Sequence, residues 1–159
     1  NQRIFCAAPE YIAAHGTPET PADLVNHNCL RLSTVEAFNR WEVNDAHSKQ
    51  AFRINGNFET TSSDALFHAT LDGLGIAKLS TYLVYDALKD GRLVRVLPDY
   101  IGDESDVLVI YPNKRNLSPN VRAFVDFLVD HFGTMPLWER SINSMHLPVS
   151  DKATVRRAL

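Results

Sequence analysis

The clearest pattern of hydrophobic and polar positions lies at residues 59–80, where the sequence reads ETTSSDALFHATLDGLGIAKLS. Leu66, Ala69 and Gly73 recur at the spacing of one helical face. Short hydroxyl residues at 61–63 precede this periodic segment, and such side chains accept hydrogen bonds from the free N–H groups of a first helical turn. The pattern therefore predicts a helix that begins near these residues and offers its N-terminus to an anion.

Two glycines end this predicted helix. Gly73 and Gly75 follow its last periodic positions, and both are expected to take the positive φ values that glycine adopts without strain. The apolar run at 76–79 comes directly after them and is typical of a short buried strand. The segment as a whole therefore predicts a helix, a glycine turn and a strand in that order.

Shorter apolar runs along the rest of the chain predict further strands, at residues 3–8, 28–32, 41–43, 51–58, 93–97 and 107–111. The third and fourth of these runs flank a polar turn, which suggests a hairpin, and the acidic segment 99–106 suggests a loop. Helices are predicted at 10–15, for one turn at 22–25, at 82–89 after a cap at Thr81, and at 119–132 after a cap at Ser118. Helices and strands therefore alternate, as they do in α/β domains.

The segment 134–159 differs in character from the chain before it. Pro136 and Pro148 interrupt it, while Trp138 and Ile142 predict only a weakly amphipathic turn or two. We expect an extension that packs on the surface of the domain or is partly disordered.

Composition narrows the class of protein. The chain has 159 residues, of which 45% are hydrophobic and 22% charged, which suffices for one well-buried core. A net charge of −3 with scattered basic residues argues against a general nucleic-acid surface, and no apolar run is long enough to span a membrane. The first residues lack the features of a signal peptide. Because the chain begins with Asn1 rather than Met, we expect the native N-terminus to lie upstream. Cys6 and Cys29 lie in apolar segments without metal-ligand spacing, which predicts reduced core thiols in a cytoplasmic protein.

Catalytic and metal-binding patterns are missing from the sequence. It has no G-x-S-x-G nucleophile elbow, and its six histidines form neither an i, i+4 pair nor a cluster at metal-ligand spacing. Gly73 and Gly75 follow a predicted helix and precede a predicted strand, which is the reverse of the order in a phosphate-binding loop. The sequence therefore predicts no catalytic residue, no metal and no cofactor.

Polar residues at the end of one predicted strand and the start of one predicted helix form a candidate ligand site. Ser33 and Thr34 follow the strand at 28–32, while Thr61 and Ser62 open the helix. Small ligands of α/β sheets bind where strands end and where helix N-termini point. These hydroxyl groups are therefore expected to lie near one another and to contact a small anion.

Four segments follow one another at a spacing that is not generic: AAPEYIAAHGTPETPADLVNHNCLRL, TTSSDALFHATLDGLGIAKLS, ALKDGRLVRVLPDY and VIYPNKRNLSPNVRAFVDFLVDHFG. Together they resemble the C-terminal effector-binding part of the LysR-type transcriptional regulators, over about residues 3–133. The GLGIA and DGRLV elements are the most specific part of this resemblance. Ser80 departs from it, because the family usually has proline at that position.

The resemblance implies an α/β module similar to type 2 periplasmic binding proteins, in which two lobes enclose a small effector. Residues 1–106 would then form mainly the second lobe, 107–133 the strand and helix that return to the first lobe, and 134–159 an extension. Most of the first lobe and a DNA-binding helix-turn-helix would precede Asn1. The return helix would expose Phe124, Phe127 and Leu128, and would pair with another copy of the chain or depend on a segment outside it.

The family's function implies a cytoplasmic sensor of a small effector, in a bacterial homo-oligomer that binds DNA through its helix-turn-helix. The candidate effector contacts are Arg31, Ser33, Thr34, Val35, Thr61, Ser62, Ser63 and Asp64. Arg31 is equally well explained as an anion ligand and as a solvent-facing strand residue. The alternatives are a periplasmic-type solute receptor and, less favoured because no catalytic set converges on the cleft, an enzyme on the same two-lobed scaffold.

Overall fold

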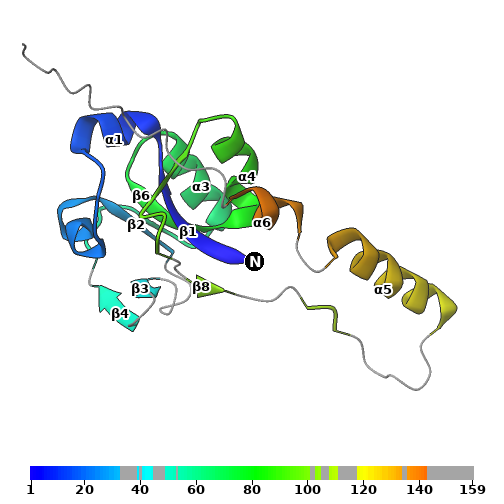
Figure 1. Ribbon diagram of the computed structural model, residues 1–159. Helices are drawn as coiled ribbons and strands as arrows, with labels where there is room; N and C mark the ends of the chain where they lie inside the picture. Colours follow the sequence, from blue (N-terminus) through cyan, green and yellow to red (C-terminus); the bar gives the residue numbers. More distant parts are fainter. Residues whose placement is uncertain are drawn as a thin grey trace, which may run out of the picture.

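The computed structural model describes residues 1–32, 39, 41–44, 49–52, 54–100, 103–104, 108–110, 118–133 and 136–142 (Figure 1). In these ranges, no helix combines the length and the apolar character needed to cross a membrane. The expected effector contacts Ser33, Thr34 and Val35 lie outside the described residues.

A mixed sheet forms the centre of the fold. Its strands lie in the spatial order β5 (Glu59–Thr60), β2 (Cys29–Leu32), β6 (Ile76–Ser80), β1 (Gln2–Ala7) and β7 (Val94–Val96), and β8 (Asp103–Glu104) also pairs with β1. Strand β2 runs parallel to β5 and β6, whereas β1 is antiparallel to β6, β7 and β8. The first strand of the chain therefore lies inside the sheet, and its start meets the carboxyl ends of β2 and β6.

Helices lie around this sheet, except for α5, which stands apart from it, and a separate hairpin lies beside the sheet (Figure 1). The helices are α1 (Pro9–His15), the 3₁₀ helix η1 (Pro21–Asn26), α3 (Ser63–Leu71), α4 (Thr81–Lys89), α5 (Pro119–Phe132) and α6 (Leu137–Ile142). The hairpin consists of β3 (Trp41–Asn44) and β4 (Lys49–Phe52). The predicted alternation of helices and strands and the predicted hairpin are thus confirmed, although two residues of the acidic segment, Asp103–Glu104, form the short strand β8.

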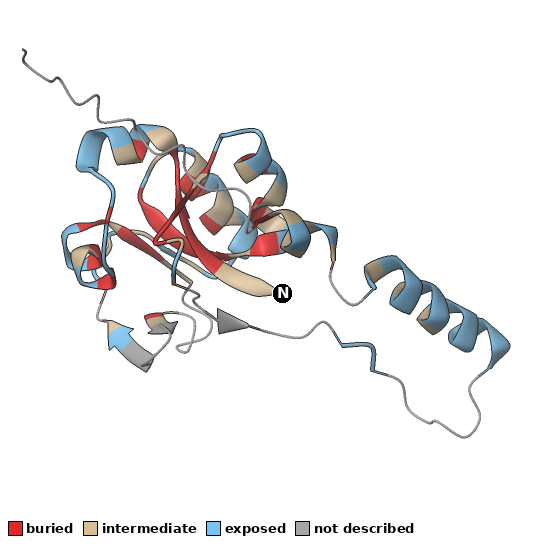
Figure 2. Ribbon diagram, in the orientation of Figure 1, coloured by how far each residue is buried: buried red, intermediate tan, exposed pale blue. Residues whose placement is uncertain are grey.

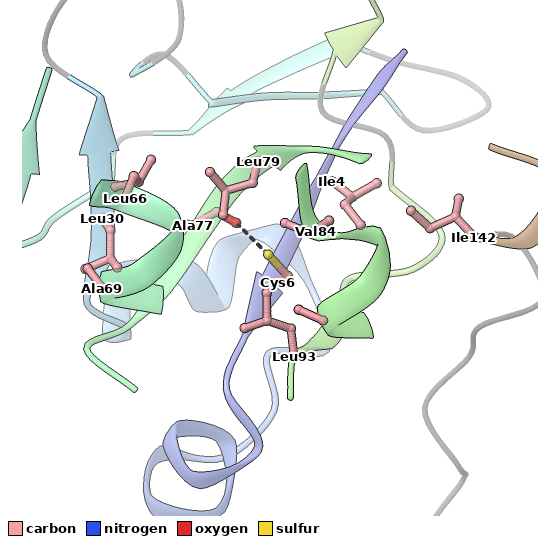
Figure 3. Close-up of a cluster of buried hydrophobic side chains, with 11 residues drawn as sticks. Ile4, Cys6, Leu30, Leu66, Ala69, Ala77, Leu79, Val84, Leu93 and Ile142 are labelled. Atoms are coloured by element: carbon pink, nitrogen blue, oxygen red, sulfur yellow. Dashed lines mark hydrogen bonds between the residues drawn. The ribbon is translucent and has the colours of Figure 1, made fainter. Parts of the chain in front are cut away.

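Two layers of side chains pack against the two faces of the sheet. On one face, Leu66 of α3 and Val84 of α4 pack with Ile4 and Leu79 of the strands (Figure 3). On the other, a second set joins α1, η1 and β3 to the sheet, and consists of Phe5, Ala7, Tyr11, Leu24, Cys29, Trp41, Ile76, Val96 and Leu97. Figure 2 shows that buried residues follow the strands of the sheet and are absent from α5. The apolar surface that stabilises the domain is therefore buried mainly between the sheet and these two layers.

The glycine turn after α3 confirms one predicted role and corrects the other. Gly73 has φ +74° and open space around its α-carbon, so it ends the helix as expected. Gly75 does not have positive φ. A β-carbon there would lie 2.1 Å from the carbonyl oxygen of Asn28, so this position requires glycine because two backbone segments approach closely.

The strand predicted at 51–58 is too long, because β4 ends at Phe52. The residues after it run beside β2 without forming a regular ladder: Asn55 accepts a hydrogen bond from the N–H of Cys29, and Phe58 accepts one from that of Arg31. Gly56 allows this approach, since a β-carbon would lie 1.9 Å from the carbonyl oxygen of Cys29. An apolar run indicates burial, and here it does not indicate a regular strand.

The prediction of a strand at 107–111 is wrong for the residues that the structure describes, 108–110. Leu108, Val109 and Ile110 belong to no strand, and Ile110 is 90% exposed. A strand needs a neighbour for its backbone hydrogen bonds, and no other described segment pairs with this one. The helix α5 that follows forms as predicted, with Ser118 accepting from the N–H of Val121 at its start.

Helix α5 carries its apolar side chains on the outside. Phe124 and Phe127 are each 59% exposed, as predicted, whereas Leu128 is half-buried rather than exposed. No residue of α5 is buried. The helix therefore adds little to the core of the domain.

Thr81 does not cap α4 as predicted, because its hydroxyl group is used elsewhere. It is the first residue of the helix and its hydroxyl donates to the carboxylate of Glu139 in α6 and contacts Asn1 Oδ1 at 3.0 Å. Ile142, at the end of α6, is fully buried among the side chains shown in Figure 3. The first part of the predicted extension is therefore a helix whose last residue belongs to the core.

Both cysteines are free and buried, which confirms their prediction as core residues. The Cys6 thiol donates weakly to the carbonyl oxygen of Ala77 at 3.9 Å (Figure 3). Burial raises the pKa of each thiol to about 12. Since the thiolate is the nucleophile, neither cysteine is a reactive group at neutral pH.

Candidate functional site

A pocket of about 240 Å³ lies at the edge of the sheet where β2 and β6 end and where α3, α4 and β1 begin. This volume corresponds to roughly eight water molecules at liquid density, which suits a small molecule. The lining combines five leucines with aromatic, hydroxyl and basic residues: Arg3, Leu30, Leu32, Trp41, Ser63, Leu66, Lys78, Leu79, Ser80, Tyr82 and Leu83.

Two basic side chains give the lining a positive charge. The register places Arg3 opposite Ser80 and Phe5 opposite Lys78, so the side chains of Arg3, Lys78 and Ser80 project from the same face of the sheet. Lys78 is buried, with 7% of its surface exposed. No acidic residue is among the described residues of the lining. Both basic residues of the lining therefore lie on the same face of the sheet.

The start of α3 forms one side of this pocket. Ser62 caps the helix, since its hydroxyl oxygen accepts from the N–H of Ala65 at 3.2 Å, and Ser63, the first residue of the helix, lines the pocket. The cap at Ser62 confirms the predicted helix start. The helix dipole adds a partial positive charge on the same side as the two basic residues.

The other predicted contacts at this helix lie away from the pocket. Thr61, Ser62 and Asp64 are exposed and do not line it. The carboxylate of Asp64 lies 3.8 Å from His68 Nε2, one turn along the exposed surface of α3.

Arg31 also lies outside the lining, on the strand that leads to the pocket. Its guanidinium Nη2 lies 2.8 Å from Glu59 Oε2, across the ladder between β2 and β5. Both side chains are more than a third exposed, so this ion pair contributes at most about 1 kcal/mol. The guanidinium of Arg31 therefore pairs with the carboxylate of Glu59 on the neighbouring strand and does not line the pocket.

Sequence reasoning missed Arg3, Lys78, Ser80, Trp41 and Tyr82. One signal was available: Lys78 interrupts the apolar strand IAKLS, and lysine is rarely buried without a functional or structural reason. Arg3 gave no such signal, because only the antiparallel pairing of β1 with β6 brings it to this edge. Trp41 reaches the pocket from the hairpin, where its ring centroid lies 5.1 Å from that of Phe5.

The sequence of this chain is similar to those of known transcriptional regulators. Residues 1–133 match the family model described as the LysR substrate binding domain. The HTH-type transcriptional regulator CrgA of Neisseria meningitidis serogroup C is 34% identical over 128 residues, a region that covers 80% of this chain and 42% of that protein. DmlR of Escherichia coli K12, also an HTH-type regulator, is 33% identical over 133 residues, which cover 83% of this chain and 43% of that protein. The chain thus spans less than half the length of these relatives.

Solved structures give the same result for the fold. The regulatory domain of CrgA from Neisseria meningitidis has a TM-score of 0.70 and 30% identity, over 83% of this chain and 65% of that one. The regulatory domain of AphB from Vibrio vulnificus, treated with cumene hydroperoxide, has a TM-score of 0.72 and 28% identity, over 81% of this chain and 64% of that one.

Proposed function

Because the chain belongs to the LysR-type transcriptional regulators and carries their effector-binding domain, we propose that the pocket at the end of β2 and β6 binds an anionic effector. The fold is the type 2 periplasmic-binding-protein-like fold of such regulatory domains, as the resemblance in sequence predicts. The observation that carries the proposal is that Arg3 and Lys78 both line the pocket and project from the same face of the sheet.

A small carboxylate with an apolar body suits this pocket best. The leucines of the lining would cover the body, and the carboxylate would face Lys78, Arg3 and the hydroxyl of Ser63. A hydrogen bond to a charged group contributes about 1.5 to 3 kcal/mol, more than a neutral one does. Ser33, Thr34, Val35 and Ser62 remain proposed effector contacts.

The other proposed properties concern the whole protein. Its relatives are named as HTH-type regulators, so we propose that this protein binds DNA through such a domain and acts in the cytoplasm. A role as a periplasmic-type solute receptor is not favoured by these relatives. We also propose that the domain is not an enzyme, since its pocket is lined by no described cysteine, histidine or carboxylate that would serve as nucleophile or base; turnover of a small carboxylate by the purified protein would refute this.

Thermal unfolding of the full-length protein with benzoate and with its uncharged amide, benzamide, tests the proposed anion site. We expect benzoate to raise the melting temperature more than benzamide does, because only benzoate pairs with the basic residues. Lys78→Met, which keeps an apolar chain of similar length, should weaken benzoate binding about tenfold or more.

Lys89→Met makes the same chemical change on the exposed end of α4 and serves as the control. Equal binding of benzoate by the Lys78 variant and this control would exclude Lys78 as a ligand contact. Thr34→Ala and Ser62→Ala are expected to weaken binding as well, and full affinity in both would remove the two sequence-derived contacts from the site.

We further propose that the apolar face of α5 is covered by a second copy of the chain in the assembled regulator. Phe124 and Phe127 are each 59% exposed, and Val121, which helical spacing places on the same face, is 39% exposed; such an arrangement is typical of interaction surfaces. Most soluble oligomers are homo-oligomers, and a symmetric pairing of two copies uses the same surface twice.

The double substitution Phe124→Asp and Phe127→Asp should lower the sedimentation coefficient in sedimentation velocity, because the protein becomes a smaller species. The melting temperature of the sheet should change little, because no residue of α5 is buried. Asp126→Asn and Asp130→Asn together change exposed polar residues of the same helix and are the control. An unchanged sedimentation coefficient in the double-aspartate variant would show that another surface makes the oligomer.

A further inference from the structure

Helix α6 follows the residues that the family model matches, yet it contacts the elements that form the pocket. The carboxylate of Glu139 accepts a hydrogen bond from the N–H of Gln2, at 2.9 Å, and another from the hydroxyl of Thr81. Gln2 precedes the pocket residue Arg3 in β1, and Thr81 lies between the pocket residues Ser80 and Tyr82. One carboxylate therefore joins the two chain segments that bring these side chains to the pocket.

Burial makes this junction strong. Thr81 is fully buried and Glu139 is partly buried, so water competes weakly for their hydrogen bond. Burial lowers the pKa of the Arg95 guanidinium, and the carboxylates of Asp99 and Glu139 act in the opposite direction. Glu139 therefore also offsets the positive charge of a residue that is 5% exposed, beyond its hydrogen bonds to Gln2 and Thr81.

The aromatic ring of Trp138 links the same wall of the pocket to α5. Its centroid lies 6.5 Å from that of Tyr82, which lines the pocket, and 5.8 Å from that of Phe132, the last residue of α5. Both ring pairs meet nearly edge to face, at 70° and 73°. A continuous set of contacts therefore runs from the pocket through α6 to the end of α5.

We propose that α6 is a clasp that couples the pocket to α5. When docked, it holds the starts of β1 and α4 in the arrangement that binds ligand, and ligand in the pocket strengthens the docking by the same factor, because coupling between two sites is reciprocal. This inference rests on the proposed function for its ligand, whereas the clasp itself is testable without one.

Hydrogen exchange of the full-length protein without ligand is the first test. Glu139→Ala removes both hydrogen bonds to α6, so amides of residues 2–3 and 80–83 should exchange about tenfold faster or more than in the wild type. Glu139→Gln keeps an acceptor oxygen and should show a smaller change. Leu137→Ala alters a residue of the same helix that is 66% exposed, and should leave the exchange of these amides unchanged.

Benzoate affinity is the second test, and it separates the clasp from the proposed function. Glu139→Ala should weaken benzoate binding about fivefold or more, with no change for Leu137→Ala. Unchanged exchange at 2–3 and 80–83 in Glu139→Ala overturns the clasp, whatever benzoate does. Equal affinity of the wild type and Glu139→Ala for benzoate overturns the coupling. Faster exchange in Glu139→Ala, with no benzoate binding to the wild type, supports the clasp and counts against the proposed anion site alone.

Discussion

Replacing Gly75 by alanine is expected to lower the free energy of unfolding by about 3 kcal/mol, the upper part of the range for overpacked sites. A β-carbon at this position would lie 2.1 Å from the carbonyl oxygen of Asn28, and backbone atoms cannot move aside as the end of a flexible side chain does. The required shift would also break the hydrogen bond of 2.9 Å from the N–H of Ile76 to the same carbonyl. Strand β6 would then lose its alignment with β2 at the end opposite the pocket.

Gly73→Ala is the matched comparison, because the two glycines are separated by a single residue and fulfil different requirements. Gly73 has φ +74°, and a β-carbon added there would have no other atom within 4 Å, so alanine costs only the strain of a left-handed conformation, about 1 to 2 kcal/mol. Urea unfolding of the two variants measures the difference. A loss for Gly73→Ala as large as that for Gly75→Ala would show that the close approach to Asn28 does not control stability.

Ile142→Ala is expected to cost about 2 to 4 kcal/mol, although Ile142 lies beyond the family-matched residues. Its side chain is fully buried with Ile4, Val84 and Leu93, so the truncation removes apolar contacts and leaves a cavity. Ile142→Val should cost about 0.5 to 1.5 kcal/mol, which gives a graded series.

Leu137→Ala controls for the removal of an apolar side chain from the same helix, since Leu137 is 66% exposed. Urea unfolding should place it within about 0.5 kcal/mol of the wild type, as is usual for surface positions. If Ile142→Ala were as mild as this control, α6 would be a dispensable attachment, which is what the sequence of the extension suggests.

Local patterns predicted most elements of the domain, because those elements form for local reasons. The start of α3 depends on the hydroxyl of Ser62, and its end on the conformational freedom of Gly73. Both requirements are visible in a few neighbouring residues. The errors arose where a distant segment decided the outcome: Thr81 donates to Glu139 instead of capping its own helix, and Gly56 approaches the backbone of β2.

The candidate site was only partly predictable for the same reason. The hydroxyl residues at the start of α3 were found because helix caps have a local pattern, and Ser63 does line the pocket. The positive charge of the pocket depends on the pairing of β1 with β6, which joins Arg3 to Ser80, far along the chain. No local pattern predicts such a pairing. Lys78, the lone lysine in an apolar strand, does indicate one of the two basic residues that line the pocket.

The place of β1 in the sheet has a consequence for how the chain reaches this structure. Strand β1 precedes its partners β6, β7 and β8 along the chain, and their paired residues run from Ala77 to Glu104. The interior of the sheet therefore cannot close until the residues up to β8 have left the ribosome, and until then the apolar edges of β1 and β6 lack their neighbours. Such non-local pairing slows folding and exposes strand edges that are prone to aggregate, so the nascent domain has its greatest need of a chaperone before β7 emerges.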